Sequence, residues 1–121
     1  MKKILIIDDS EMVRNFHCYI LRNAGFEVKS ASDGSQGLEY FFSDSCDLVI
    51  TDINMPLMDG YTMIERIRNE DEFDDIPIII ASTEDEAGDK EKGFEAGANI
   101  YIVKPTEPEQ MVENVKLLLG E

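Results

Sequence analysis

The 121-residue chain contains no tryptophan, one histidine and only two cysteines. Cys18 and Cys46 have neither CxxC nor CxxH spacing, so the sequence predicts neither a disulfide framework nor a zinc site. No apolar run approaches the roughly 20 residues that a membrane-spanning helix needs. The apolar stretch after the two N-terminal lysines is too short for a signal peptide. We therefore expect a cytoplasmic protein with inert thiols and no membrane partner.

Positive charge is also scarce. Lysine and arginine number 11 against 26 acidic residues, which gives a net charge of −15 at pH 7. A surface of this sign repels phosphate backbones, so the sequence predicts no direct binding to nucleic acid. The length fits a single domain covering residues 1–121, which is large enough to bury a core without metal or disulfide support.

Short apolar runs alternate with segments of helical periodicity along the whole chain. Five strands are predicted, at residues 4–7, 27–31, 48–51, 76–81 and 100–103. Three of these runs are rich in Ile and Val without polar alternation, a pattern typical of a parallel sheet covered by helices on both faces. Strict alternation of strand and helix indicates right-handed crossovers and an open, doubly wound α/β sheet.

Five helices are predicted between and after these strands. The apolar stripe of the first is expected to contain Val13, Phe16 and Ile20. The fourth, at residues 86–96, has few apolar side chains and contains Gly88 and Gly93, each of which costs about 1 kcal/mol relative to alanine. We therefore expect the fourth helix to move most easily.

Residues capable of chemistry follow the predicted strands at their carboxyl ends. Asp8 and Asp9 follow the first strand, and Asp52 follows the third. Ser82 follows the fourth strand, and Lys104 follows the fifth. Since ligands of open parallel sheets bind beyond the carboxyl ends of the strands, these side chains are expected to converge on one edge.

Three carboxylates brought together repel one another, and a divalent cation relieves that repulsion. A set of oxygen ligands without sulfur or imidazole favours Mg²⁺. Beside a metal, a lysine and a hydroxyl, Asp52 would act as a nucleophile toward phosphorus and form an aspartyl phosphate. Lys104 and Ser82 would then neutralise the charge of the transferring group. Taken singly, each residue could be a helix cap, a turn residue or a surface charge, but their joint placement favours the chemical interpretation.

The chain resembles the receiver domains of two-component response regulators over its whole length. The stretches that carry the resemblance are ILIIDDS, DLVITDINMPLMDG, IPIIIAST and AGANIYIVKP. The resemblance implies the flavodoxin-like, CheY-like strand order 2-1-3-4-5 and phosphorylation of Asp52 by a sensor histidine kinase. It also implies a Mg²⁺ held by Asp9, Asp52 and the backbone carbonyl of Asn54, with Asp8 acting through water.

The resemblance further implies a switch pair, Ser82 and Tyr101, whose readout is the face formed by the fourth helix, the fifth strand and the fifth helix. The Lys104–Pro105 peptide bond is expected to be cis, as is usual in this family. One departure from the family pattern is Thr106, which stands where a phenylalanine is common and is expected on or near the readout face.

Asn54 and Glu84 would flank the route of an attacking water and so modulate dephosphorylation. The same pair occurs in CheY-like chemotaxis regulators, and we therefore hypothesise a monomeric bacterial chemotaxis regulator whose target is a protein such as the flagellar motor switch. Because little chain follows the fifth helix, output is expected to be a partner-binding event. The alternative is a receiver of another phosphorelay, or one cut from a longer regulator, with a different output. In either case the chain would catalyse its own phosphotransfer and autodephosphorylation and is not expected to be an enzyme.

Other functions fit parts of the pattern less well. A phosphatase of the haloacid dehalogenase type would need a second acid where this chain has Asn54. A flavodoxin would need a phosphate-binding loop after the first strand, where the acidic pair Asp8 and Asp9 would repel phosphate. A degenerate receiver that acts only as an interaction module would not need the complete set of site residues. The sole histidine, His17, is interpreted as a residue of the first helix without a chemical role, so another protein must supply the phosphoryl group.

Overall fold

The computed structural model describes residues 1–121 and alternates five strands with five helices. The strands are β1 (Lys3–Ile7), β2 (Glu27–Ala31), β3 (Leu48–Thr51), β4 (Ile78–Ser82) and β5 (Ile100–Val103). The helices are α1 (Glu11–Asn23), α2 (Gly34–Ser43), α3 (Gly60–Arg68), α4 (Ala87–Ala96) and α5 (Pro108–Leu119), with a short 3₁₀ helix, η1 (Asp71–Phe73). None of these helices combines the length and apolar character that crossing a bilayer requires.

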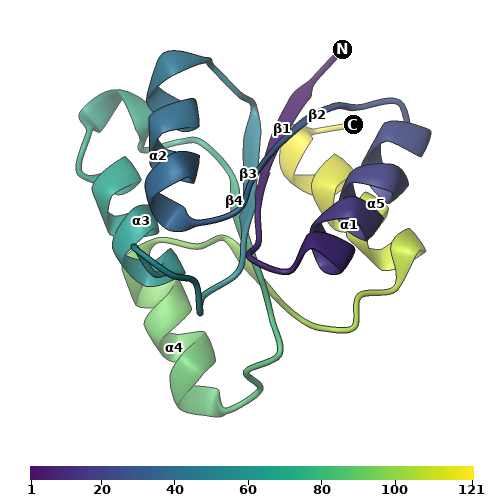
Figure 1. The fold of residues 1–121 in the computed structure, drawn as a ribbon. Helices are drawn as coiled ribbons and strands as arrows, with labels where there is room; N and C mark the ends of the chain where they lie inside the picture. Colours follow the sequence, from purple (N-terminus) through teal and green to yellow (C-terminus); the bar gives the residue numbers. More distant parts are fainter.

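The sheet has the order β2-β1-β3-β4-β5, and every neighbouring pair is parallel. This confirms the doubly wound fold and the predicted strand order. Helices α1 and α5 cover one face of the sheet, and α2, α3 and α4 cover the other (Figure 1). The central strands are almost entirely buried, whereas the edge strand β2 alternates between buried and exposed residues. Strand order reverses between β1 and β3, which places the ligand-binding edge at their carboxyl ends.

Two apolar clusters form the core, one on each face of the sheet. The cluster below α1 and α5 includes Leu21, Met111 and Val115, and the opposite cluster includes Ile64 and Ile67 of α3. Three helices begin at a side chain that accepts a hydrogen bond from the backbone of the first turn: Ser10, Asp33 and Asp59. Each such cap contributes about 1 kcal/mol to the stability of its helix.

The buried face of α1 differs from the predicted stripe. Phe16 is 45% exposed, and the buried residues are His17, Cys18, Ile20 and Leu21. Ile20 of the predicted stripe is thus buried and Val13 is half-buried, but Phe16 is not, because the sheet-facing side of the helix runs through His17 instead. Strand β4 begins two residues later than predicted, and the 3₁₀ helix η1 was not predicted.

That α4 moves most easily stays a prediction, but the helix is sparsely buried, since Gly93 is its only buried residue. This glycine allows close packing as well as lowering helix propensity. A Cβ atom at Gly93 would lie 2.8 Å from Cδ1 of Ile80 and 3.2 Å from Cδ2 of Tyr101. Glycine at this position therefore permits α4 to approach β4 and β5 closely.

Candidate functional site

The carboxyl edge of the sheet brings a lysine together with three aspartates. The Nζ atom of Lys104 lies 2.8 Å from Oδ2 of Asp8 and 3.1 Å from Oδ2 of Asp52. One carboxylate oxygen from each of Asp8, Asp9 and Asp52 lies within 4.8 Å of the others. The structure thus places these four residues together, as the strand-end positions predict.

Strand register explains why these side chains meet. Ile7 of β1 pairs with Thr51 of β3, so the next residue of each strand is an aspartate. The backbone N–H of Asp52 donates to the carbonyl of Ile7 at 2.9 Å, which extends the ladder by one bond. Gly60 packs against the carbonyl of Asp52 so closely that any Cβ atom there would overlap it. The main chain of Asp52 is therefore held between two neighbouring segments of main chain.

Lys104 is charged although it is largely removed from water. Its side chain is 8% exposed, and those of Asp8 and Asp52 are 3% and 12% exposed. Burial alone would lower the pKa of Lys104, but the hydrogen bond to Asp8 and the charge of Asp52 outweigh burial and raise it. The ammonium group therefore remains protonated in the pH range of biology.

Asp52 responds differently from its lysine partner. Burial raises the pKa of Asp52, and this effect outweighs both the hydrogen bond from the backbone N–H of Ile53 and the charge of Lys104, each of which lowers it. An ion pair with Lys104 should by itself depress the pKa of Asp52, so the opposite net shift means that one lysine does not compensate this buried, acidic edge. An additional cation would stabilise the ionised form.

A second group of predicted residues meets at Glu84. The amide Nδ2 of Asn54 donates to the Glu84 carboxylate at 3.0 Å. The backbone N–H of Glu84 donates to the hydroxyl of Ser82 at 3.1 Å, and the phenol of Tyr101 donates to the Glu84 carbonyl at 2.8 Å. Burial raises the pKa of the Tyr101 phenol, which therefore stays a donor. The sequence pairs Asn54 with Glu84 and Ser82 with Tyr101, but only the three-dimensional structure shows that Glu84 is the common partner of the other three residues.

Two contacts that orient Asp8 were not predicted. The guanidinium of Arg14 donates to the Asp8 carbonyl at 2.8 Å, and the backbone N–H of Ser10 donates to the Asp8 carboxylate at 2.9 Å. Arg14 lies on α1. The sequence could have suggested this contact only through the position of Arg14 on that helix, close after the first strand. The Lys104–Pro105 bond is cis, as expected from the family resemblance.

Two further residues lie deeper than the sequence suggested. His17 is 2% exposed on the inner face of α1, where burial lowers its pKa more strongly than the charge of Asp8 raises it, so the imidazole is neutral at neutral pH. Thr106 is 6% exposed, and its hydroxyl has no hydrogen-bond partner in the protein. Thr106 therefore does not contribute to an exposed readout surface, contrary to the expectation from its position.

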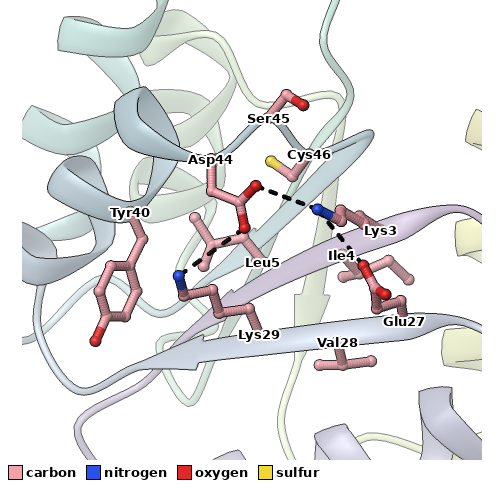
Figure 2. A pocket seen from close by; sticks show the side chains of 10 residues that line it. All are labelled: Lys3, Ile4, Leu5, Glu27, Val28, Lys29, Tyr40, Asp44, Ser45 and Cys46. Carbon is pink, nitrogen blue, oxygen red and sulfur yellow. Dashed lines mark hydrogen bonds and ion pairs between the residues drawn. The ribbon is translucent and has the colours of Figure 1, made fainter.

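A second lysine lies between two carboxylates at the opposite end of β1. The Nζ atom of Lys3 lies 3.6 Å from Glu27 and 3.2 Å from Asp44, and Asp44 also lies 3.9 Å from Lys29. Figure 2 shows these side chains around a pocket of about 260 Å³. All four side chains are 41–54% exposed, so water solvates each charge.

A parallel 2-1-3-4-5 sheet with a buried lysine and three aspartates at its carboxyl edge defines a CheY-like α/β protein. Comparison with protein families agrees, since residues 4–116 match the response regulator receiver domain. The chain therefore belongs to the response regulator receiver family. It is a receiver of two-component signalling, a phosphoacceptor signalling module of a family whose domains accept phosphoryl groups from histidine kinases. Its cluster of Asp8, Asp9 and Asp52 is typical of the Mg²⁺ site of receivers.

Curated relatives include transcriptional regulators. The chain is 34% identical over 119 residues to the DNA-binding dual master transcriptional regulator RpaA of Synechocystis sp. and 34% identical over 118 residues to the alkaline phosphatase synthesis transcriptional regulatory protein PhoP of Bacillus subtilis. These matches cover 98% of this chain but only 49% and 48% of the two relatives. The chain thus spans about half the length of the curated relatives it matches.

Solved structures of similar length also match. The chemotaxis response regulator CheY4 of Vibrio cholerae is 33% identical with a TM-score of 0.92, covering 98% of this chain and 99% of that protein. A CheY-like receiver domain protein from Methanospirillum hungatei is 28% identical with a TM-score of 0.92, covering 99% of this chain and 94% of that one. A chemotaxis response regulator and a CheY-like receiver from another organism therefore share this backbone.

Proposed function

We propose that Asp52 is the phosphoacceptor of this receiver. The observation that carries the proposal is a largely buried carboxylate whose pKa burial raises, placed 3.1 Å from a lysine that is itself shared with Asp8. Such a group is rigidly oriented toward an incoming phosphorus. The phosphoryl group that it would accept adds negative charge to this edge, so the reaction depends on the countercharge of Lys104 and of a cation.

The proposed reaction transfers a phosphoryl group from a phosphohistidine of the kinase. A carboxylate oxygen of Asp52 attacks phosphorus, the new O–P bond forms as the P–N bond breaks, and the imidazole leaves. The ammonium group of Lys104 lies beside the position where the new charge develops and stabilises it. The Ser82 hydroxyl accepts a hydrogen bond from the N–H of Glu84 and can donate its own proton to a phosphoryl oxygen.

The same edge fits Mg²⁺. Three carboxylate oxygens within 4.8 Å of one another provide the hard, negatively charged ligands that this cation prefers. We assign Asp9, Asp52 and the backbone carbonyl of Asn54 as ligands, with Asp8 acting through water. When bound, Mg²⁺ would neutralise carboxylate charge and orient the phosphoryl oxygens.

Glu84 is proposed to connect the acceptor to the switch. Ser82 and Tyr101 both bind the main chain of Glu84, and Asn54 binds its side chain. If the Ser82 hydroxyl turns toward a phosphoryl group, the N–H of Glu84 loses its acceptor, which weakens the arrangement that holds Tyr101. The readout would then be the surface built from α4, β5 and α5, where Phe94 is already 50% exposed.

Mass spectrometry of the intact chain tests the phosphoacceptor assignment. Incubation with acetyl phosphate and Mg²⁺ should add about 80 Da, the mass of one phosphoryl group, to the wild type. Asp52→Asn should gain nothing, whereas Asp59→Asn, which alters only the cap of α3, should be labelled like the wild type. The assignment is wrong if Asp52→Asn is labelled as well. Labelling of the wild type that EDTA leaves unchanged would contradict the proposed Mg²⁺ site.

For the output, we propose regulation of chemotaxis through a partner such as the flagellar motor switch. The pair Asn54 and Glu84, hydrogen-bonded to each other, and the likeness to Vibrio cholerae CheY4 over nearly its full length support this proposal. The second candidate is the receiver part of a transcriptional regulator, supported by RpaA and PhoP.

The lifetime of the phosphorylated chain helps to distinguish these outputs. A chemotaxis regulator should lose its phosphoryl group within minutes, and a lifetime of many hours would contradict that output. Replacing Asn54 by alanine should change the decay rate, because Asn54 and Glu84 flank the approach of water to Asp52. Phosphorylation-dependent binding to a purified motor switch protein would complete the test.

A further inference from the structure

Helix α4 has few apolar contacts with the rest of the protein, so polar contacts carry much of its attachment. Gly93 is its only buried residue, and Phe94 is 50% exposed. Two phenols bind the main chain around its first turn. Tyr101 of β5 donates to the carbonyl of Glu84, just before the helix, and Tyr61 of α3 donates to the carbonyl of Asp89 at 3.2 Å.

Tyr61 holds one turn of α4 by two kinds of contact. Its hydroxyl binds the carbonyl of Asp89, and its ring lies 4.6 Å from the ammonium group of Lys92, three residues further along the same helix. The residue is 9% exposed, and burial together with neighbouring acidic groups raises the pKa of the phenol to about 12. The hydroxyl therefore remains protonated and available as a donor.

The main chain next to Tyr61 is coupled to the acceptor segment. The N–H of Gly60 donates to the carbonyl of Ile53 at 2.8 Å, and the α-carbon of Gly60 packs on the carbonyl of Asp52. Asp59 fixes the start of α3 by accepting from the N–H of Thr62 at 3.0 Å. The main chain that carries Tyr61 is thus anchored at Asp52. Tyr61 is the first side chain of α3, and it contacts α4.

The first turn of α4 is consequently linked to the acceptor strand by two routes. One runs from Asn54 to Glu84, and the other runs from Gly60 through Tyr61 to Asp89. We propose that Tyr61 is a second positioning residue of the switch, whose hydroxyl holds α4 in its position in the unmodified chain and releases it when Asp52 is phosphorylated. This inference rests on the proposed function of Asp52 and adds a residue of α3 to the switch pair.

Amide hydrogen exchange of α4 in Tyr61→Phe tests the inference. The variant keeps the ring and the contact with Lys92 but removes the hydroxyl. In the unmodified chain, exchange at residues 87–93 should accelerate by about fivefold, the effect of one lost hydrogen bond. After phosphorylation with acetyl phosphate and Mg²⁺, wild type and variant should exchange at the same rate. Tyr19→Phe, which removes a hydroxyl from a residue that is 66% exposed on α1, is the matched control and should leave α4 unchanged.

Each outcome decides between a switch role and a structural one. Unchanged exchange in unmodified Tyr61→Phe would show that the hydroxyl does not hold α4 and would overturn the inference. Equal acceleration before and after phosphorylation would mean that the contact is only structural and would also overturn it. If the wild type gains no mass, both the switch role of Tyr61 and the proposed function fail. A labelled wild type with the same α4 difference in both states removes only the role of Tyr61.

Discussion

The protein contains two clusters of the same composition at opposite ends of β1: one lysine between two carboxylates. At the carboxyl end Lys104 lies between Asp8 and Asp52, and the three side chains are 3–12% exposed. At the amino end Lys3 lies between Glu27 and Asp44, and the three side chains are 41–54% exposed (Figure 2). Both lysines have a raised pKa.

The difference between the clusters lies in the carboxylates. Burial raises the pKa of Asp52 despite its lysine, whereas water screens the charges around Lys3. A buried cluster with more negative than positive charge is electrostatically unsatisfied, and this makes it responsive to a cation or to a covalent change. An exposed cluster of the same residue types changes the free energy of unfolding very little. It does not respond to a cation or to a covalent change in this way.

Lys104→Met should produce the largest loss of stability. It leaves Asp8 and Asp52 buried without a countercharge, which typically costs about 3 kcal/mol in the free energy of unfolding. Urea denaturation without divalent cations, at neutral pH, measures this loss. Lowering the pH should shrink it, because Asp52, whose pKa is raised by burial, can then take up a proton. A loss that stays the same in acid would contradict the electrostatic explanation.

Asp52→Asn should have a smaller effect of opposite sign, stabilising the protein at neutral pH by about 1 kcal/mol, the usual size of a single stabilising substitution. The pKa of Asp52 is raised above its ordinary value of 3.8 on folding, so stability linked to this group is complete below that value and is lost as the pH rises through the folded-state pKa. The variant escapes this loss, while Lys104 keeps its contact with Asp8.

Denaturation midpoints of wild type and Asp52→Asn, compared from acid to neutral pH without divalent cations, check this expectation. The two curves should converge toward about pH 4, where the wild-type carboxyl approaches the neutral state of the amide. A variant that is less stable than wild type at neutral pH would show that the ion pair with Lys104 outweighs burial.

The sequence was sufficient for the sheet and for the buried cluster. Strands β1, β3 and β4 contain runs of Ile, Leu and Val without polar alternation, a pattern typical of a sheet covered on both faces. Once the strands are parallel, their carboxyl ends share one edge, so Asp8, Asp52 and Lys104 had to converge. The apolar pattern of the strands and the rule that parallel strands end at the same edge are therefore enough to predict that these side chains lie close together.

Features that depend on packing between elements could not be derived in this way. The buried face of α1 includes His17, which no count of apolar residues would select. Glu84 is the common partner of Ser82 and Tyr101 because β4, β5 and the segment that carries Glu84 lie together in the folded chain. The sequence does not give these distances. The sequence did not indicate the contact of Tyr61 with α4. Its hydroxyl donates to a backbone carbonyl, and because every residue has a carbonyl, a pattern of residue types cannot show which one accepts.

Lys3→Met should have the smallest effect and completes the comparison with Lys104→Met. The pKa of Lys3 is raised chiefly by its hydrogen bond with Asp44, but the side chain is exposed. Losing it therefore leaves Asp44 and Glu27 hydrated by water and Asp44 still near Lys29. Urea denaturation at low and at high salt should give the same midpoint for this variant and the wild type. A loss comparable to that of Lys104→Met would mean that the number of ion pairs, not their burial, determines the energetic difference between the two ends of β1.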